Sequence, residues 1–325
     1  MTMSPETCRR LSEALYARIG RDPILRPLFP GKTLRCAIEE FAAYLVQFHG
    51  GPAELTQKRW WLSIQESHRR FRIGRRERAA WLKNMKLALD DVQLADPALR
   101  DFFDHASAYL VNEGEPPAAA AKPDSAAWDT QLALDETVAA VRAGDRDRAL
   151  ALAANLRLDP SRRCGLLALM LGRFDDYVHG ELRRDPTLVR ARFGGRSLLH
   201  LAAEAGSLAT IKLLIELGAD PNASSAGHHT PLYSVANSQR HPDGAEIVRV
   251  LTAAGARVDA ADGVMHCTPL HMAARRGNLE VARALLEAGA NPEARDTRGD
   301  TPLQRAMKMR HPEVAGLLRG WRQAR

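Results

Sequence analysis

The stretch Glu66–Gly74 reads ESHRRFRIG and places one histidine, His68, three residues before an aromatic residue, Phe71. A neutral imidazole is a common ligand of iron, and a flat aromatic cofactor needs an apolar slot beside that ligand. A lone histidine on a helix is more often structural. The role of His68 therefore depends on the side chains that the rest of the chain brings to it.

The apolar spacing of residues 1–112 predicts four long helices and a short helix that bears His68. The first begins at Ser4-Pro5, a capping residue followed by a first-turn proline. The others begin near Thr33, near Gly74 and at Asp96-Pro97. Aromatic residues recur on these helices, including Tyr16, Phe41, Phe48, Trp81, Phe102, Phe103 and Tyr109. We expect an all-α domain with an aromatic interior.

In this order and spacing, Tyr16, Phe29-Pro30, Gly50-Gly51, His68 and Trp81 resemble the motifs of the truncated (2-over-2) haemoglobins, closest to group II. The resemblance covers residues 1–112. It implies a haem b cofactor with His68 as the proximal iron ligand, and reversible binding of O₂ or another diatomic ligand.

The same resemblance implies the distal side. Tyr16 would be the distal tyrosine, and the indole N–H of Trp81 would donate toward the ligand. Ala37 occupies the distal position that is histidine in many globins and cannot donate a hydrogen bond. Phe41, one turn later, would form a wall of the pocket.

Further haem contacts follow from the resemblance and from charge. Phe29, before Pro30, would pack on the haem. Six arginines cluster around His68, and we choose Arg72 for a haem propionate because arginine suits carboxylates; most of the others form a solvated basic face. Phe71, Ile73 and Met85 complete the expected haem contacts.

A second pattern occupies the rest of the chain. SLLH at Ser197, TPLY at Thr230, TPLH at Thr268 and TPLQ at Thr301 recur at steps of 33, 38 and 33 residues. Each of the first three precedes an apolar helix that ends in Gly-Ala, at Gly218, Gly255 and Gly289. A capping threonine, a proline at the first helical position and a glycine after the last predict paired helices. This pattern resembles the ankyrin repeat.

Two weaker units precede these four, over residues 137–160 and 165–192, which makes about six units. The last lacks the glycine between its helices, and Arg310 stands there. Residues 113–125 read EGEPPAAAAKPDS, a linker composition. We therefore predict a globin domain (1–112), a Pro/Ala linker (113–125) and an ankyrin solenoid (126–325) that binds a protein partner.

Composition limits the function further. A net charge of +7 on 325 residues is too small to indicate a nucleic-acid surface. The four cysteines form no Cys-x-x-Cys pair, no apolar run reaches the ~18 residues of a membrane span, and no signal sequence precedes the first helix. We expect a cytoplasmic protein. His266, Cys267 and His271 are close in sequence, but His271 occupies the usual histidine position of the repeat.

Three functions remain open from sequence. The first is a haem protein whose ligand binding serves sensing or localised delivery through the repeats. The second is an enzyme with nitric-oxide dioxygenase or peroxidase-like chemistry, which would need an external reductant. The third is a haem-free ankyrin adaptor with a globin-like front.

Overall fold

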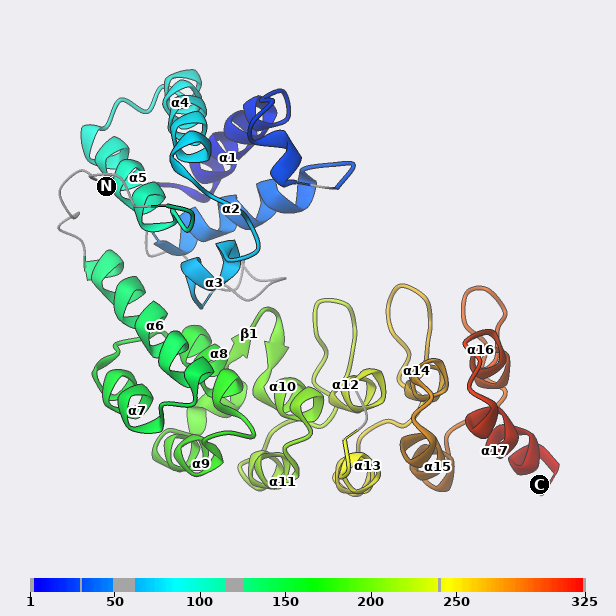
Figure 1. Ribbon diagram of the computed structural model, residues 1–325. Helices are drawn as coiled ribbons and strands as arrows, with labels where there is room; N and C mark the ends of the chain where they lie inside the picture. Colours follow the sequence, from blue (N-terminus) through cyan, green and yellow to red (C-terminus); the bar gives the residue numbers. More distant parts are fainter. Residues whose placement is uncertain (1–2, 30, 49–61, 115–125, 239–240, 324–325) are drawn as a thin grey trace. The chain divides into compact units, whose positions relative to one another are not determined.

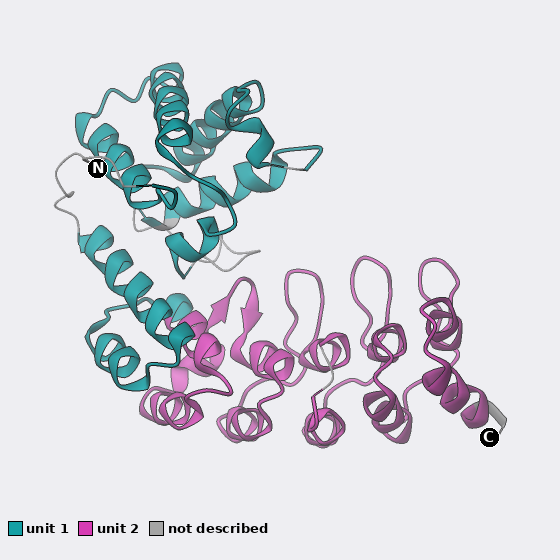
Figure 2. Cartoon of the chain, viewed as in Figure 1, with its two compact units in different colours: residues 1–162 teal, residues 163–325 magenta. Residues whose placement is uncertain are grey.

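The chain is mainly α-helical over the residues that its computed structural model describes, which are 3–29, 31–48, 62–114, 126–238 and 241–323. It forms two compact units, residues 1–162 and 163–325 (Figure 2). The boundary lies inside helix α8 (Pro160–Met170). The unit boundary therefore lies beyond the expected linker, and the 1–112 and 126–325 domain boundaries stay predictions.

Unit 1 contains the five helices expected from residues 1–112 and three more described helices, η1, α6 and α7. They are α1 (Pro5–Ile19), η1 (Arg26–Leu28), α2 (Arg35–Phe48), α3 (Ile64–His68), α4 (Arg75–Asp91), α5 (Pro97–Tyr109), α6 (Ala126–Ala143) and α7 (Arg146–Asn155). The predicted caps are confirmed: the Ser4 side chain accepts a hydrogen bond from the amide of Thr7, and Asp96 accepts one from that of Ala98. The Gly50-Gly51 motif and most of the linker lie outside the described residues.

The core of unit 1 is built on α1, which packs against α2 and α4. Leu11, Leu15 and Ile19, which share one face of α1 at helical spacing, are fully buried. Ser12 on the same helix donates a 2.7 Å hydrogen bond to the carbonyl of Ile38 on α2. Trp128 of α6 belongs to this core as well and has no exposed surface.

Unit 2 is a stack of helix pairs (Figure 1). Its first pair is α8 with α9 (Asp175–Arg184), followed by a short helix η3 (Pro186–Arg190) and a hairpin of β1 (Arg192–Phe193) and β2 (Arg196–Ser197). The four predicted repeats follow as α10 (Leu198–Ala205) with α11 (Leu208–Glu216), α12 (Pro231–Asn237) with α13 (Gly244–Ala253), α14 (Pro269–Arg276) with α15 (Leu279–Glu287), and α16 (Pro302–Lys308) with α17 (Pro312–Gln323). First helices pack on first helices and second on second, as in an ankyrin solenoid.

The predicted glycine turns are confirmed. Gly218, Gly255 and Gly289 end the second helices with φ of +84°, +91° and +93°, a conformation that glycine adopts without steric cost. The connection between α12 and α13 is longer than that between α10 and α11, which accounts for most of the extra length of the 38-residue step.

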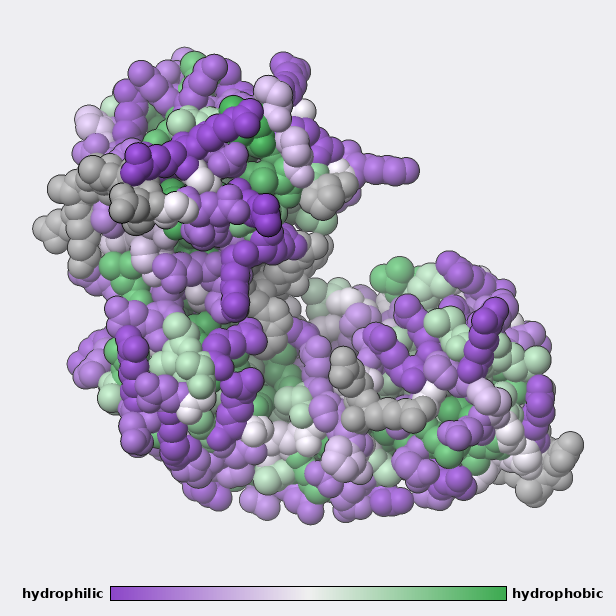
Figure 3. Space-filling model, in the orientation of Figure 1, coloured by the Kyte–Doolittle hydropathy of each residue, from purple (hydrophilic) through white to green (hydrophobic). Residues whose placement is uncertain are grey.

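No helix among the described residues is long and apolar enough to cross a membrane. On the face drawn in Figure 3, hydrophilic side chains predominate, with smaller apolar areas between them.

Candidate functional site

His68 is the last residue of α3, a five-residue helix that Ser63 caps by accepting a 3.0 Å hydrogen bond from the amide of Glu66. Its Nδ1 lies 2.8 Å from the carbonyl oxygen of Ile64, one turn earlier, and 2.9 Å from Oγ of Ser67. The carbonyl can only accept, so Nδ1 carries the proton and the ring lone pair is on Nε2. Burial lowers the pKa of His68, which favours the neutral imidazole that metals require.

Aromatic rings lead from His68 toward α1. The ring centroids of His68 and Phe71 are 6.1 Å apart, and those of Phe71 and Phe29 are 5.7 Å apart. Phe29 then meets Tyr16 edge to face at 5.7 Å. These four side chains come from three separate segments of the chain, and all are partly buried.

The series continues from Tyr16 to the expected distal tryptophan. The ring centroids of Tyr16 and Phe41 of α2 are 6.2 Å apart, and those of Phe41 and Phe103 of α5 are 6.4 Å apart. Phe103 meets Trp81 of α4 at 5.8 Å, edge to face. We call His68, Phe71, Phe29, Tyr16, Phe41, Phe103 and Trp81 the aromatic series.

Two polar groups in the aromatic series have no protein partner. Within the described residues, neither the hydroxyl of Tyr16 nor the indole N–H of Trp81 makes a hydrogen bond. Burial, and then the negative charge of Glu40, raise the pKa of Tyr16, so its hydroxyl stays protonated and able to donate. Both groups are therefore able to donate to a ligand that binds beside these rings.

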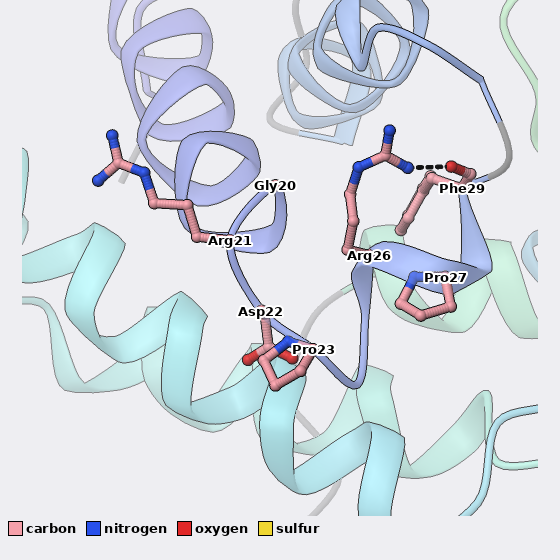
Figure 4. Close-up of a pocket in the computed structure, with 7 residues that line it drawn as sticks. All are labelled: Gly20, Arg21, Asp22, Pro23, Arg26, Pro27 and Phe29. Atoms are coloured by element: carbon pink, nitrogen blue, oxygen red, sulfur yellow. Dashed lines mark hydrogen bonds between the residues drawn. The ribbon is translucent and has the colours of Figure 1, made fainter.

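Phe29 is held by the turn that precedes it. The guanidinium of Arg26 donates to the carbonyl of Phe29 (Figure 4). It also donates, at 2.8 Å, to the carbonyl of Gly31. Asp22 accepts from the amides of Ile24 and Leu25 at 2.9 and 3.0 Å, which fixes the start of this turn. A surface pocket of about 400 Å³ opens beside Phe29.

The other expected haem contacts are more scattered. Arg72 is 88% exposed and its Nε lies 3.4 Å from a carboxylate oxygen of Glu113. The amide of Ile73 donates a hydrogen bond to the side chain of Asn112, and its carbonyl accepts one from the amide of Asn112. Met85 is buried in the core. Ala37 is half-buried on α2, one turn before Phe41. The structure thus brings His68 and the predicted aromatic residues into one series, while Arg72 lies at the surface.

Residues of α6 contact the His68 segment, and no motif in the sequence predicted these contacts. The carboxylate of Asp135 accepts a 3.0 Å hydrogen bond from the amide of Ile64, the first residue of α3. Gln131 donates to the carbonyl of Leu62 at 2.9 Å. No local signal could have indicated these contacts, because the partners are 69 and 71 residues apart in sequence.

The described residues fit a haem group on these observations. A neutral imidazole with its lone pair on Nε2, a run of partly buried aromatic rings and two donors without partners are the features that such a cofactor needs.

Comparison with known families agrees with the architecture. A family model for bacterial-like globins matches residues 4–106, and one for ankyrin repeats matches residues 139–262 and 243–322, more than half of the chain. The chain belongs to the ankyrin-repeat proteins and carries a bacterial-like globin domain. The globin match spans every residue of the aromatic series.

Individual relatives match about a third of the chain. They include a transient receptor potential cation channel subfamily A member 1 homolog from Caenorhabditis elegans (35% identical over 121 residues, 37% of this chain and 10% of the relative). Ankyrin repeat and SOCS box protein 3 from Bos taurus is 40% identical over 111 residues (34% and 20%), and cyclin-dependent kinase 4 inhibitor B from Rattus norvegicus is 31% identical over 125 residues (38% and 92%). The chain spans only a tenth to a fifth of the first three relatives.

The ankyrin unit uses its own histidines structurally. Nδ1 of His271 contacts the backbone amide and hydroxyl of Thr268, and its Nε2 lies 3.0 Å from the carbonyl of Asp300 in the next loop. The hydrogen bond to the neighbouring loop is the one that the repeat pattern predicts.

Proposed function

We propose that the globin domain binds haem b through His68 and reversibly binds O₂ or another diatomic ligand, as a truncated globin of the group II type. The observation that carries this proposal is the aromatic series, which joins a neutral imidazole at one end to two donors, Tyr16 and Trp81, that have no hydrogen-bond partner among the described residues. The bacterial-like globin match supports it.

Each residue has a distinct task in this proposal. The haem iron would supply the position at which the diatomic ligand coordinates. His68 would hold the iron through Nε2, with its ring oriented by the Ile64 carbonyl. Phe29 and Phe71 exclude water from the cofactor. Tyr16 and Trp81 donate hydrogen bonds to the ligand, since Ala37 cannot.

We further propose that the repeat stack binds a protein partner, so that ligand binding is sensed or delivered locally in the cytoplasm. Stacked repeats expose long continuous surfaces that suit protein recognition. Val264, on a loop between helix pairs, is 74% exposed and is an example of apolar surface available to a partner.

The first test is the absorbance spectrum of the full chain after haem addition, in ferric, ferrous and CO-bound forms, for the parent and for His68→Ala. We expect a stoichiometric Soret band and a CO complex in the parent, and loss or a large shift of both in the variant. His266→Asn, at an exposed histidine of unit 2, is the matched control and keeps the parent spectrum. A parent that takes up no haem contradicts the proposal and leaves an ankyrin adaptor.

The second test addresses the distal donors. Tyr16→Phe removes only the hydroxyl, and Trp81→Leu removes the indole N–H. Each should speed O₂ dissociation by roughly tenfold, because one hydrogen bond to the ligand is worth about 1–3 kcal/mol. Stopped-flow displacement of O₂ by CO measures the rate, with Tyr177→Phe in unit 2 as control. Unchanged rates in both variants rule out the distal assignment.

A further inference from the structure

The start of α3 is held by a buried polar network on α6. Asp135 is 3% exposed, and Gln131, one turn earlier, is 2% exposed. Gln131 Nε2 donates to the carbonyl of Leu62 at 2.9 Å and to Oδ1 of Asp135 at 3.0 Å. The hydroxyl of Tyr109 donates to Oδ2 of Asp135 at 3.0 Å. With the amide of Ile64, three donors converge on one carboxylate.

Ile64 connects this network to His68 by hydrogen bonds on both sides of its backbone. The amide of Ile64 donates to Asp135, and its carbonyl accepts from Nδ1 of His68 at 2.8 Å. The position of Ile64 therefore sets the position of the oxygen that orients the imidazole. A second contact joins the same two helices, since Arg142 of α6 lies 3.7 Å from Glu66 of α3.

We propose that Asp135 is a positioning residue for His68, acting through Ile64, and so makes the proximal side of the haem site depend on α6. The proposal rests on the haem-binding function proposed above. The helix α6 follows the linker and packs on α7, so the residue that orients the imidazole belongs to the segment that leads into the repeats. A displacement of His68 along α3 would be transmitted to α6 through the Ile64–Asp135 hydrogen bond, and the reverse holds equally.

The first readout needs no haem. Hydrogen–deuterium exchange of the haem-free full chain, followed by mass spectrometry, reports on the peptides that cover residues 62–68. We expect exchange there to be at least about tenfold faster in Asp135→Ala than in the parent, because the amide of Ile64 loses its acceptor. Glu136→Ala, at the exposed neighbouring position on α6, is the control and leaves exchange unchanged.

The second readout is the iron–histidine stretching band of the ferrous, haem-loaded chain in resonance Raman spectra. Asp135→Ala should shift or broaden this band, since the imidazole loses its fixed orientation. Asp135→Asn keeps an acceptor oxygen for Ile64 and should restore the parent band, an outcome that general loss of stability would not produce.

The outcomes separate the two proposals. A parent without an iron–histidine band overturns the haem assignment and this role with it. A parent band that a folded Asp135→Ala leaves unchanged, or unchanged exchange at residues 62–68, overturns this role alone. If Asp135→Ala does not fold, Ile64→Pro removes the amide donor to Asp135 at the first position of α3, where proline is tolerated. An unchanged band in a folded Ile64→Pro then overturns the proposal.

Discussion

Histidines in this chain have different tasks according to the partners of their ring nitrogens. His200 lies fully buried in the first of the four clear repeats; its Nδ1 contacts Ser197, and its Nε2 lies 2.9 Å from the carbonyl of His229. Burial lowers the pKa of His200 to about 4. In His68 the Nδ1 bond to Ile64 lies within its own helix, and the tautomer directs the lone pair of Nε2 outward from that bond.

His200 should make the stability of unit 2 fall as the pH falls. Its pKa is about 6.5 when unfolded, so the unfolded chain gains a proton first. The free energy of unfolding begins to fall near pH 6.5, has fallen by about 2 kcal/mol at pH 5, and stops falling near pH 4. His200→Gln should make this slope shallower, because Gln304 occupies the same position of the last repeat and caps its helix without titrating there.

Urea unfolding of the parent and of His200→Gln at pH 8 and pH 5 measures the effect. His228→Gln, at an exposed loop histidine, is the control and should keep the parent slope. An equal loss of stability on acidification in the parent and in His200→Gln would contradict the assignment.

At the scale of the element, the turn between paired helices shows where the last repeat departs from the others. Gly206 and Gly277 adopt φ of +72° and +68° there, and Arg310 adopts +60° at the corresponding turn. A side chain in the left-handed region costs roughly 1–2 kcal/mol, so the last repeat retains strain that the others avoid.

Arg310→Gly should therefore stabilise unit 2 by about 1 kcal/mol, after the greater freedom of glycine in the unfolded chain is subtracted. Gly277→Ala should do the opposite, because an added Cβ would lie 2.4 Å from the ring of His311 in addition to the unfavourable φ. Thermal unfolding followed by circular dichroism compares both with Arg310→Lys, which should match the parent. A destabilised Arg310→Gly would show that the arginine side chain contributes more than the turn costs.

At the scale of the whole molecule, unit 1 extends past the segment 113–125 that composition predicted to be a linker between domains. The side chain of Trp128 on α6 lies within 5.4–5.7 Å, ring centre to ring centre, of His105, Phe102 and Tyr109 on α5. A helix that follows a linker-like segment thus completes the core of the globin-bearing unit.

Trp128→Ala should lower the free energy of unfolding of unit 1 by about 3–5 kcal/mol, as expected for removal of a fully buried aromatic side chain. Denaturant unfolding followed by near-ultraviolet circular dichroism measures the change, with the exposed substitution Glu136→Ala as control. A loss below about 1 kcal/mol would mean that α6 contributes little to this core.

Local chemistry made the helices and repeats predictable from sequence. The residues that begin and end helices act within a few positions of their own place in the chain: Ser4, Asp96, the threonines at the repeat starts and the glycines at the repeat ends. Their effect on helix boundaries can therefore be predicted from the local sequence. The resemblance of the His68 segment to a globin also needed only order and spacing, and the bacterial-like globin match bears out that domain.

Tertiary structure alone decided how the His68 segment is supported. The hydrogen bond from Ile64 to Asp135 joins residues 71 positions apart, on the two sides of the segment 113–125 that composition predicted to be a linker. Likewise, Arg72 pairs with Glu113 at the surface, which no spacing rule indicates. Such contacts depend on how separate helices pack, and a periodic pattern records which face of a helix is buried but not which helix covers it.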